Sequence, residues 1–367
     1  MNRLLVTGGA GFIGGNFVYH WRETHPADNM VVLDALTYAG NLQTLAPLLE
    51  EEKAAFVQGD ICNEALLAEL FDRNDFTHVV HFAAESHVDR SIAAPDAFIR
   101  TNINGTHALL KAARKAFEAG RGFVRFHHVS TDEVYGSLGP RDPAFSETTP
   151  YAPRSPYAAS KAASDHLVQA YNHTFGLPVT ISNCSNNYGP YHFPEKLIPL
   201  MIVNALSGKP LPVYGDGGNV RDWLHVSDHC AAIAAILLRG RDGETYNVGG
   251  NNEVANIDLV QTLCDLVDAR FAADPALARH FPQAPAATGR PTRDLIAFVQ
   301  DRPGHDRRYA INAAKIAREL GFAPRVTFAQ GLGQTLDWYL RNEPWWRAVQ
   351  SGAYRDWIAA HYGDKVN

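Results

Sequence analysis

The sequence predicts an α/β protein with a Rossmann-type, doubly wound parallel sheet and a smaller, mixed C-terminal domain. Three observations predict this fold. Strand-like and helical segments alternate through half of the chain, a glycine-rich turn separates the first strand from the first helix, and an acidic residue ends the second strand. Alternating strands and helices form a parallel sheet with helices on both faces. Glycine turns and strand-end acids at these places are typical of dinucleotide-binding folds.

Six strands are predicted from short apolar, β-branched runs, with helical patterns in most of the gaps. Two runs, residues 79–84 and 179–181, are apolar enough to be buried on both faces of a sheet. The predicted strands cover residues 3–7, 30–34, 54–58, 78–83, 122–129 and 178–183.

The alternation loosens after about residue 185, where prolines punctuate shorter elements. We therefore expect residues 1–185 to form the dinucleotide-binding domain and residues 186–367 to form mainly a substrate-binding domain. A helix and a strand predicted within 223–250 are expected to return to the first domain. A Pro- and Ala-rich stretch at 272–292 has the composition of a surface insertion, and no internal repeat is found.

The glycine-rich turn has the spacing of a pyrophosphate-binding loop. Gly9, Gly11 and Gly14 fit G-x-G-x-x-G, and Gly8 also gives G-x-x-G-x-x-G, at the start of an apolar, helical run. Glycines permit the tight turn and let backbone N–H groups approach a phosphate at the helix N-terminus. Asp34 ends the second strand, where a carboxylate binds the ribose 2′-hydroxyl and repels a 2′-phosphate. This pattern indicates NAD rather than NADP as the cofactor.

Composition excludes several classes of partner. The chain has 367 residues, 46% of them hydrophobic, which is enough for two domains with cores of their own. Its net charge of −6 offers no basic surface for nucleic acid or an anionic membrane. We find no signal peptide and no apolar run near the ~20 residues that a membrane span needs.

The cysteines and histidines do not have the pattern of a metal site. The strand histidines suit core positions better than metal ligation, and the scattered cysteines lack zinc-ligand spacing. We therefore expect no metal, reduced thiols and a cytoplasmic location. The residues concerned are Cys62, Cys184, Cys230 and Cys264, with His78, His81, His127 and His128.

Tyr157 and Lys161 are candidates for moving a proton during a redox step. Ser155 and Pro156 suit the N-cap and first position of a helix, so Tyr157 and Lys161 lie one turn apart on one face. A phenol has a pKa of ~10, and a nearby ammonium and nicotinamide charge are expected to lower it. Tyr157 then takes a proton from a substrate hydroxyl, and Lys161 holds the nicotinamide ribose. The alternative is an ordinary surface Tyr–Lys pair.

Asp132 and Glu133 directly follow the predicted strand at 122–129 and the short link Ser130-Thr131. Active-site groups gather at the carboxyl ends of parallel strands, so a turn there points both acids into the crevice. Thr131 is placed to hydrogen-bond a substrate hydroxyl. The alternative is a solvated acidic loop. The presence of Tyr157 as a candidate proton-transfer group favours a catalytic pair.

These residues carry a family resemblance. The chain resembles the extended short-chain dehydrogenase/reductase family and, within it, the dTDP-glucose 4,6-dehydratases, nearly from end to end. The acidic pair is the specific part, because related sugar epimerases lack it. The matching segments are residues 37–41 (TYAGN), 82–89 (FAAESHVD), 130–136 (STDEVYG), 183–190 (NCSNNYGP), 193–197 (FPEKL), 221–223 (RDW), 301–309 (DRPGHDRRY) and 351–354 (SGAY).

The resemblance implies a redox-neutral dehydration of a nucleotide sugar with NAD as cofactor. It implies that Tyr157 takes the proton of the 4-hydroxyl as hydride leaves carbon 4. Glu133 then removes the proton on carbon 5, and protonated Asp132 donates to the departing 6-hydroxyl. Hydride returns to carbon 6, which gives dTDP-4-keto-6-deoxyglucose from dTDP-glucose. A carboxyl group has a pKa of ~3.9, so Asp132 needs a raised pKa, which the charge of Glu133 and desolvation would provide.

The resemblance also implies individual contacts. For the cofactor they are Gly8, Gly11, Phe12, Ile13, Gly14, Asp34, Leu36, Thr37, Asp60, Ile61, Phe82, Ala83, Ala84, Ser86, Thr101, Tyr157, Lys161 and Asn187. For the nucleotide sugar they are Ser86, Thr131, Asn186, Lys196, Leu197, Pro212, Tyr214, Arg221, Asn256, Asp301, Arg302 and His305.

Relatives imply a homodimer through a four-helix interface, with helices near 104–119 and 157–173 from each subunit. Two other functions stay open at this point. One is an NAD-dependent nucleotide-sugar epimerase or decarboxylase, against which the acidic pair argues. The other is a non-catalytic NAD-binding regulator, for which the set of proton-transfer groups has no use.

Overall fold

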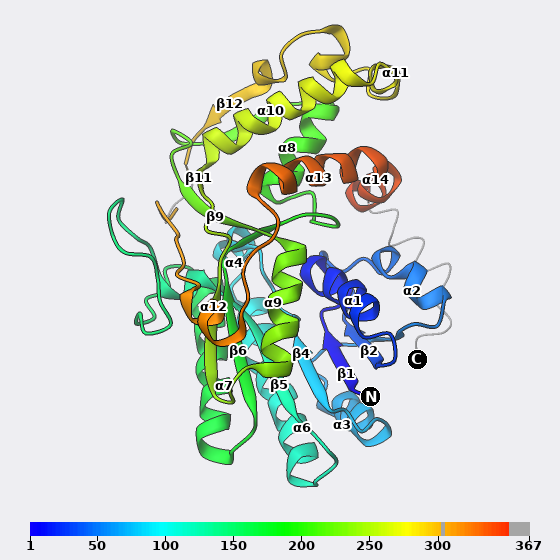
Figure 1. The fold of residues 1–367 in the computed structure, drawn as a ribbon, viewed down its shortest axis with the longest axis vertical. Helices are drawn as coiled ribbons and strands as arrows, with labels where there is room; N and C mark the ends of the chain where they lie inside the picture. The colour runs from blue at the N-terminus through cyan, green and yellow to red at the C-terminus, as the bar shows by residue number, and fades with distance from the viewer. Residues whose placement is uncertain (302–304, 352–367) are drawn as a thin grey trace.

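The central element is a seven-stranded parallel sheet, which confirms the predicted Rossmann-type class (Figure 1). The structure is a computed structural model that describes residues 1–301 and 305–351. The strands run in the order β10-β6-β5-β4-β1-β2-β3. Their bounds are β1 (Arg3–Thr7), β2 (Asn29–Asp34), β3 (Ala55–Gln58), β4 (His78–His81), β5 (Arg125–Thr131), β6 (Val179–Cys184) and β10 (Glu244–Val248).

The six predicted strands are all present, with shifts at their ends. The largest shift is in β5, which begins at Arg125 rather than 122, because pairing starts where Arg125 lies opposite His78 of β4. The seventh strand, β10, pairs with β6 at the edge of the sheet.

Helices cover both faces of the sheet and bury two separate apolar clusters. Leu67, Leu109 and Val168 pack one face, and Phe17 and Ile233 pack the other. The first face carries α3 (Glu64–Arg73), α6 (Thr106–Glu118) and α7 (Pro156–Phe175); the second carries α1 (Phe12–Thr24) and α9 (Val226–Arg239). Shorter helical segments connect them: η1 (Leu42–Thr44), α2 (Ala46–Glu50), α4 (Val88–Ala93), α5 (Asp96–Phe98), the π-helical η2 (Ile99–Gly105), η3 (Asp132–Tyr135) and α12 (Ala314–Leu320).

A second, mostly helical region lies over the carboxyl end of the sheet (Figure 1). Its core is one apolar cluster that includes Met201, Leu259, Leu336 and Trp346. Its helical segments are α8 (Leu197–Leu206), α10 (Asn256–Ala273), α11 (Ala276–His280), η4 (Pro285–Thr288), η5 (Thr292–Leu295), α13 (Phe328–Arg341) and α14 (Glu343–Ser351). Two small sheets accompany them, with strands β7 (Asn186–Tyr188), β8 (Leu211–Tyr214), β9 (Val220–His225), β11 (Glu253–Ala255) and β12 (Ile296–Val299).

The stretch at 272–292 lies mostly at the surface, as expected, but two of its side chains reach the core of the second region. Phe281 is 2% exposed and Ala284 is 1% exposed, and both belong to the core of the second region. Thr292 is also buried, and its hydroxyl donates to Asp268 of α10 at 2.6 Å. The stretch is therefore a largely exposed segment that a few buried side chains anchor to a core.

Candidate active site

A cavity of about 540 Å³ lies at the carboxyl ends of the central strands, a common size for a ligand site. Residues that follow β1, β2, β4, β5 and β6 line the wall on the side of the central sheet. Residues of the second region line the opposite wall. In an open parallel sheet this edge, where the strand order reverses beside β1, is where ligands bind.

The cavity brings together nearly all of the predicted site residues. Those from the sheet side are Gly8, Gly11, Phe12, Ile13, Gly14, Asp34, Thr37, Asp60, Ile61, Phe82, Ala83, Ala84, Ser86, Thr101, Thr131, Asp132, Glu133, Tyr157, Lys161 and Asn187. Those from the second region and its links are Asn186, Lys196, Leu197, Pro212, Tyr214, Arg221, Asn256 and His305.

Leu36 and Asp301 are not among the residues that line the cavity. Leu36 has a left-handed backbone (φ 51°), and its N–H donates to the carboxylate of Asp34 at 2.8 Å, so it shapes the loop instead. Asp301 accepts from Nδ1 of His305 at 2.6 Å and so orients a lining residue. Arg302 and the motif residues 303–304 and 352–354 lie outside the described residues.

The glycine turn forms a close-packed cradle at the N-terminus of α1. A Cβ at Gly14 would lie 2.3 Å from the carbonyl oxygen of Gly8, and a Cβ at Gly8 (φ +73°) would lie 2.5 Å from the backbone nitrogen of Ala83. Gly11 is the N-cap and supplies no side chain to cap the first N–H groups. Gly11, Phe12, Ile13 and Gly14 line the cavity, so this helix terminus, which no side chain caps, lies at the cavity wall, as an anion-binding site requires.

Asp34 ends β2 beside this cradle and is 9% exposed. Its two oxygens accept from the backbone N–H of Ala10 at 2.9 Å and of Leu36 at 2.8 Å. Burial raises the pKa of Asp34, and the two backbone hydrogen bonds oppose that rise. The carboxylate thus ties the glycine turn to the loop after β2, and it lines the cavity where a ribose hydroxyl would lie.

The turn that follows β5 places the two acidic residues, Asp132 and Glu133, in different surroundings. The side chain of Thr131 caps the short η3 helix by accepting from the N–H of Glu133 at 3.3 Å. Asp132 is 1% exposed, and its Oδ2 has no hydrogen-bond partner within residues 1–301 and 305–351. Burial, and next the charge of Glu133, raise the pKa of Asp132 well above its usual value. One carboxyl is therefore a buried acid, and its neighbour Glu133 is partly exposed to the cavity.

Tyr157 and Lys161 lie on α7, which begins as predicted with the Ser155 hydroxyl accepting from the N–H of Ala158 at 3.1 Å. Burial, and next the charge of Glu133, raise the pKa of Tyr157 well above its usual value. The expected lowering depends on the charge of the bound nicotinamide as well as that of Lys161, so it stays a prediction for the enzyme with its cofactor. Lys161 is 4% exposed, and its ammonium donates to the carbonyl of Val129 at 2.8 Å.

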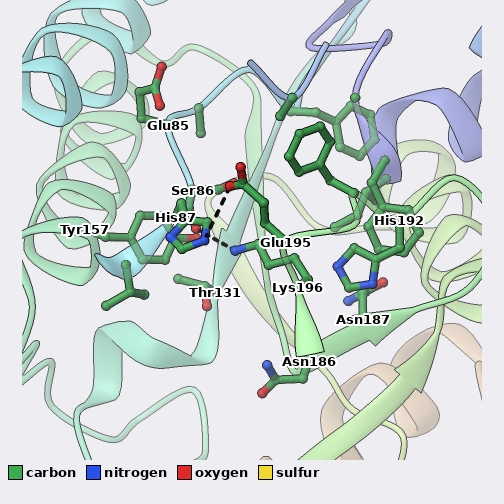
Figure 2. A pocket seen from close by; sticks show the side chains of 18 of the residues that line it. Glu85, Ser86, His87, Thr131, Tyr157, Asn186, Asn187, His192, Glu195 and Lys196 are labelled. Carbon is green, nitrogen blue, oxygen red and sulfur yellow. Dashed lines mark hydrogen bonds and ion pairs between the residues drawn. The ribbon is translucent and has the colours of Figure 1, made fainter. Parts of the chain in front are cut away.

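The opposite wall of the cavity carries two cationic side chains, Lys196 and Arg221. Lys196 donates to the carbonyl of Ser86 at 3.1 Å, which joins the loop after β4 to the start of α8 (Figure 2). Arg221 is 6% exposed and donates to the carbonyls of Val220 at 2.8 Å and Asp306 at 2.9 Å. The guanidinium of Arg221 is thus held at the cavity wall by two backbone carbonyls.

The sequence analysis missed His192, which lines the cavity near the glycine cradle (Figure 2). Its ring stacks on Phe12 of α1 with 4.2 Å between ring centroids. It is 9% exposed, burial lowers its pKa to about 3, and Nδ1 has no hydrogen-bond partner in the described part of the chain. Nothing in the local sequence separates this histidine from a core residue, because its role depends on a loop meeting α1 across the fold.

The described residues contain neither a cluster that could hold a metal ion nor a membrane-spanning helix. No group of three or more His, Cys, Asp or Glu side chains there is arranged to hold a metal ion. No helix in that part of the chain is both long and apolar enough to cross a bilayer.

The glycine cradle, the strand-end acid and the Tyr–Lys pair on a helix after β5 define an extended short-chain dehydrogenase/reductase. Within that class, the family model described as GDP-mannose 4,6 dehydratase matches residues 5–335. A dTDP-glucose 4,6-dehydratase of Xanthomonas campestris is 58% identical over 96% of this chain and 97% of its own. The chain belongs to the dTDP-glucose 4,6-dehydratase family.

Solved structures agree with this placement. A dTDP-glucose 4,6-dehydratase from Streptomyces venezuelae, solved with NAD bound, is 47% identical with a TM-score of 0.83 and covers 95% of this chain and 99% of that one. A UDP-glucose 4-epimerase from Thermotoga maritima is 25% identical with a TM-score of 0.79 and covers 93% and 99%. The dehydratase is thus nearly twice as similar in sequence as this epimerase.

Proposed function

We propose that this protein converts dTDP-glucose to dTDP-4-keto-6-deoxyglucose with tightly held NAD. The observation that carries the proposal is that Asp132 and Glu133, at the end of β5, have different surroundings: Asp132 is buried and Glu133 is partly exposed. A buried carboxyl whose pKa is raised and a partly exposed carboxyl share one cavity with Tyr157. Removal of water needs both an acid and a base, and two carboxyl groups in unlike surroundings supply them.

The residues of the sheet edge fit NAD. The first N–H groups of α1 would bind the pyrophosphate, and Asp34 would accept from the adenosine 2′-hydroxyl. His192 joins this set, because it lines the cavity and its ring stacks on Phe12 in the first turn of α1. Bound NAD would accept hydride from carbon 4 of the sugar and return it to carbon 6.

The chain's own groups handle the protons. Tyr157 accepts the proton of the 4-hydroxyl, and since its pKa is raised in the protein alone, phenolate forms only with positive charge nearby. Lys161 and the bound cofactor would supply that charge. Once carbon 4 is a ketone, Glu133 removes the acidified proton on carbon 5. Asp132 then donates its proton to the departing 6-hydroxyl, and Thr131 orients the sugar. Glu133 returns its proton to carbon 5 as hydride reaches carbon 6, and the proton on Tyr157 passes through solvent to restore that of Asp132.

The second region holds the nucleotide. Arg221 and Lys196 lie on the wall opposite the cradle and offer positive charge to a diphosphate. In this arrangement residues 1–185 and 223–250 bind the cofactor, and the remaining C-terminal residues bind the nucleotide sugar. The other proposed contacts with the nucleotide sugar are Ser86 on the sheet side and, on the opposite wall, Asn186, Leu197, Pro212, Tyr214, Asn256 and His305.

We further propose a homodimer in the cytoplasm. The four cysteines are free thiols, as in a reducing compartment. Ile92 and Ile99, on segments that lead into α6, are 48% and 50% exposed, and α6 and α7 pack side by side. Molar mass in solution by light scattering tests the dimer, and a value near the 40.3 kDa of one chain would contradict it.

Incubation with dTDP-glucose, followed by mass analysis, tests the activity. The proposal expects a product lighter by one water. A sugar nucleotide of unchanged mass would point to an epimerase, and loss of carbon dioxide from a uronic acid substrate would point to a decarboxylase.

A further inference from the structure

A buried carboxylate that the reaction above does not use lies one helical turn after Lys161. Asp165 of α7 is 1% exposed. Its Oδ2 accepts from the hydroxyl of Ser130 at 2.8 Å and from the hydroxyl of Tyr151 at 2.9 Å. Removing a carboxylate from water is costly unless another charge compensates it. The nearest opposite charge in the described fold is therefore the first place to look for its purpose.

His128 of β5 joins this carboxylate to Lys161. Its Nε2 lies 3.3 Å from Nζ of Lys161 and 3.3 Å from Oδ1 of Asp165. Its Nδ1 has no hydrogen-bond partner anywhere in residues 1–301 and 305–351. Burial and the charge of Lys161 lower the pKa of His128 well below its usual value, so the ring is neutral. Within the described residues, the ammonium of Lys161 and the carboxylate of Asp165 thus both lie beside the same ring nitrogen, Nε2, which places the ring between the two charges.

We propose that Asp165 is a positioning residue of the reaction: its buried carboxylate is the counter-charge that keeps Lys161 an ammonium at the cavity wall, with His128 held between them. The inference rests on the proposed function, because it assigns a purpose to the charge of Lys161. Burial strips the ammonium of water, and a lysine in a dry site gives up its proton unless a negative charge opposes that.

The electrostatics agree with this geometry. Burial lowers the pKa of Lys161 to about 8, and the charge of Asp165 opposes this lowering more than any other charge does. Burial raises the pKa of Asp165 to about 6, against Lys161 and the two hydroxyl donors. The pair titrates jointly, so both groups are charged in the window between these values. Other titratable groups facing the pair are His81 of β4, Cys184 of β6, Tyr135 of η3, Tyr151, and His166 and Tyr157 of α7.

The pH dependence of sugar oxidation tests the proposal. Bound NADH formed from dTDP-glucose in a single turnover is followed by absorbance in the unmutated enzyme and in Asp165→Asn. The unmutated rate should fall above about pH 8, where Lys161 loses its proton. In Asp165→Asn that fall should move down by about one pH unit or more, which is about tenfold in rate on the alkaline side. Asp165→Glu, which keeps a carboxylate, should restore the alkaline limit toward its original pH.

Asp228→Asn is the matched control. Asp228 is also buried, at 4% exposure, and accepts from the N–H groups of Arg325 and Val326, but it does not line the cavity. Its replacement should leave the alkaline limit unchanged. An unchanged limit in folded Asp165→Asn would overturn the proposal.

Tyr151→Phe decides the matter if Asp165→Asn does not fold. It removes one donor that favours the charged carboxylate, so the pKa of Asp165 should rise from about 6 and the acidic limit of the rate should rise with it. An acidic limit that stays in place would overturn the proposal. Because NADH reports oxidation whether or not water is lost, a variant series that oxidises without dehydrating would refute the proposed function and still test Asp165.

Discussion

Replacing Glu133 with glutamine should separate oxidation of the sugar from loss of water. The amide has the shape of the carboxylate, and the N–H of residue 133 still donates to Thr131, so the turn after β5 is kept. A positioned base contributes roughly 10²–10⁴-fold to a proton transfer. Elimination should therefore slow by about that factor in Glu133→Gln.

The same change should spare oxidation. After burial, the charge of Glu133 contributes most to the raised pKa values of both Tyr157 and Asp132. Removing a negative charge lowers both pKa values. Tyr157 then gives up its proton more readily, so oxidation should keep its rate and extend to lower pH. Asp132 holds its proton less firmly, which adds to the defect in elimination.

Two measurements on one single-turnover reaction check this. Absorbance follows bound NADH, which should accumulate and persist in Glu133→Gln, and mass analysis follows the loss of water. Glu69→Gln on α3, a surface glutamate paired with Arg73, is the control and should behave as the unmutated enzyme. Elimination within about tenfold of normal, or oxidation that falls as far as elimination, would refute the assignment of Glu133.

Three further predictions concern the cofactor and the core. Asp34→Ala should weaken NAD binding roughly ten- to a hundredfold and narrow the gap to NADP, because it removes an acceptor and a repulsive charge; equal reactivation of stripped, unmutated enzyme by both cofactors would contradict this. His192→Asn places an amide nitrogen near the position of Nδ1 and should bind NAD better than His192→Phe, which keeps only the stack on Phe12; equal affinities measured by titration calorimetry would count against a cofactor contact. Phe281→Ala should cost about 3–5 kcal/mol of unfolding free energy, whereas Phe298→Ala, at a side chain 62% exposed, should cost under about 0.5 kcal/mol, and equal losses in denaturant unfolding would refute the buried role of the 272–292 stretch.

The central sheet could be predicted because its strands are long enough to show an apolar pattern. The strands of the second region could not, since β7 and β11 have three residues each and a period of two is invisible in them. Composition indicated a surface at 272–292, which holds for most of that stretch, but it could not show that Phe281 belongs to the core of the second region.

The site shows the same division. Spacing alone placed Tyr157, Lys161 and the acidic pair at one edge of the sheet. It could not say which acid keeps its proton, because that depends on Asp132 turning inward while Glu133 stays partly exposed. The pKa of Tyr157 in the protein alone is raised by desolvation, which is a property of the folded cavity and cannot be read from the sequence pattern. Asp165 carried a usable signal, four residues after Lys161, which places both on one helix face.

The central claim, that one sugar gives up and regains the same hydride, is tested most directly with dTDP-glucose deuterated at carbon 4. The account expects a product that has lost one water and carries deuterium at carbon 6, because the cofactor stays bound between the two hydride transfers. Deuterium that is lost to solvent, or a product that retains the oxygen on carbon 6, would contradict it.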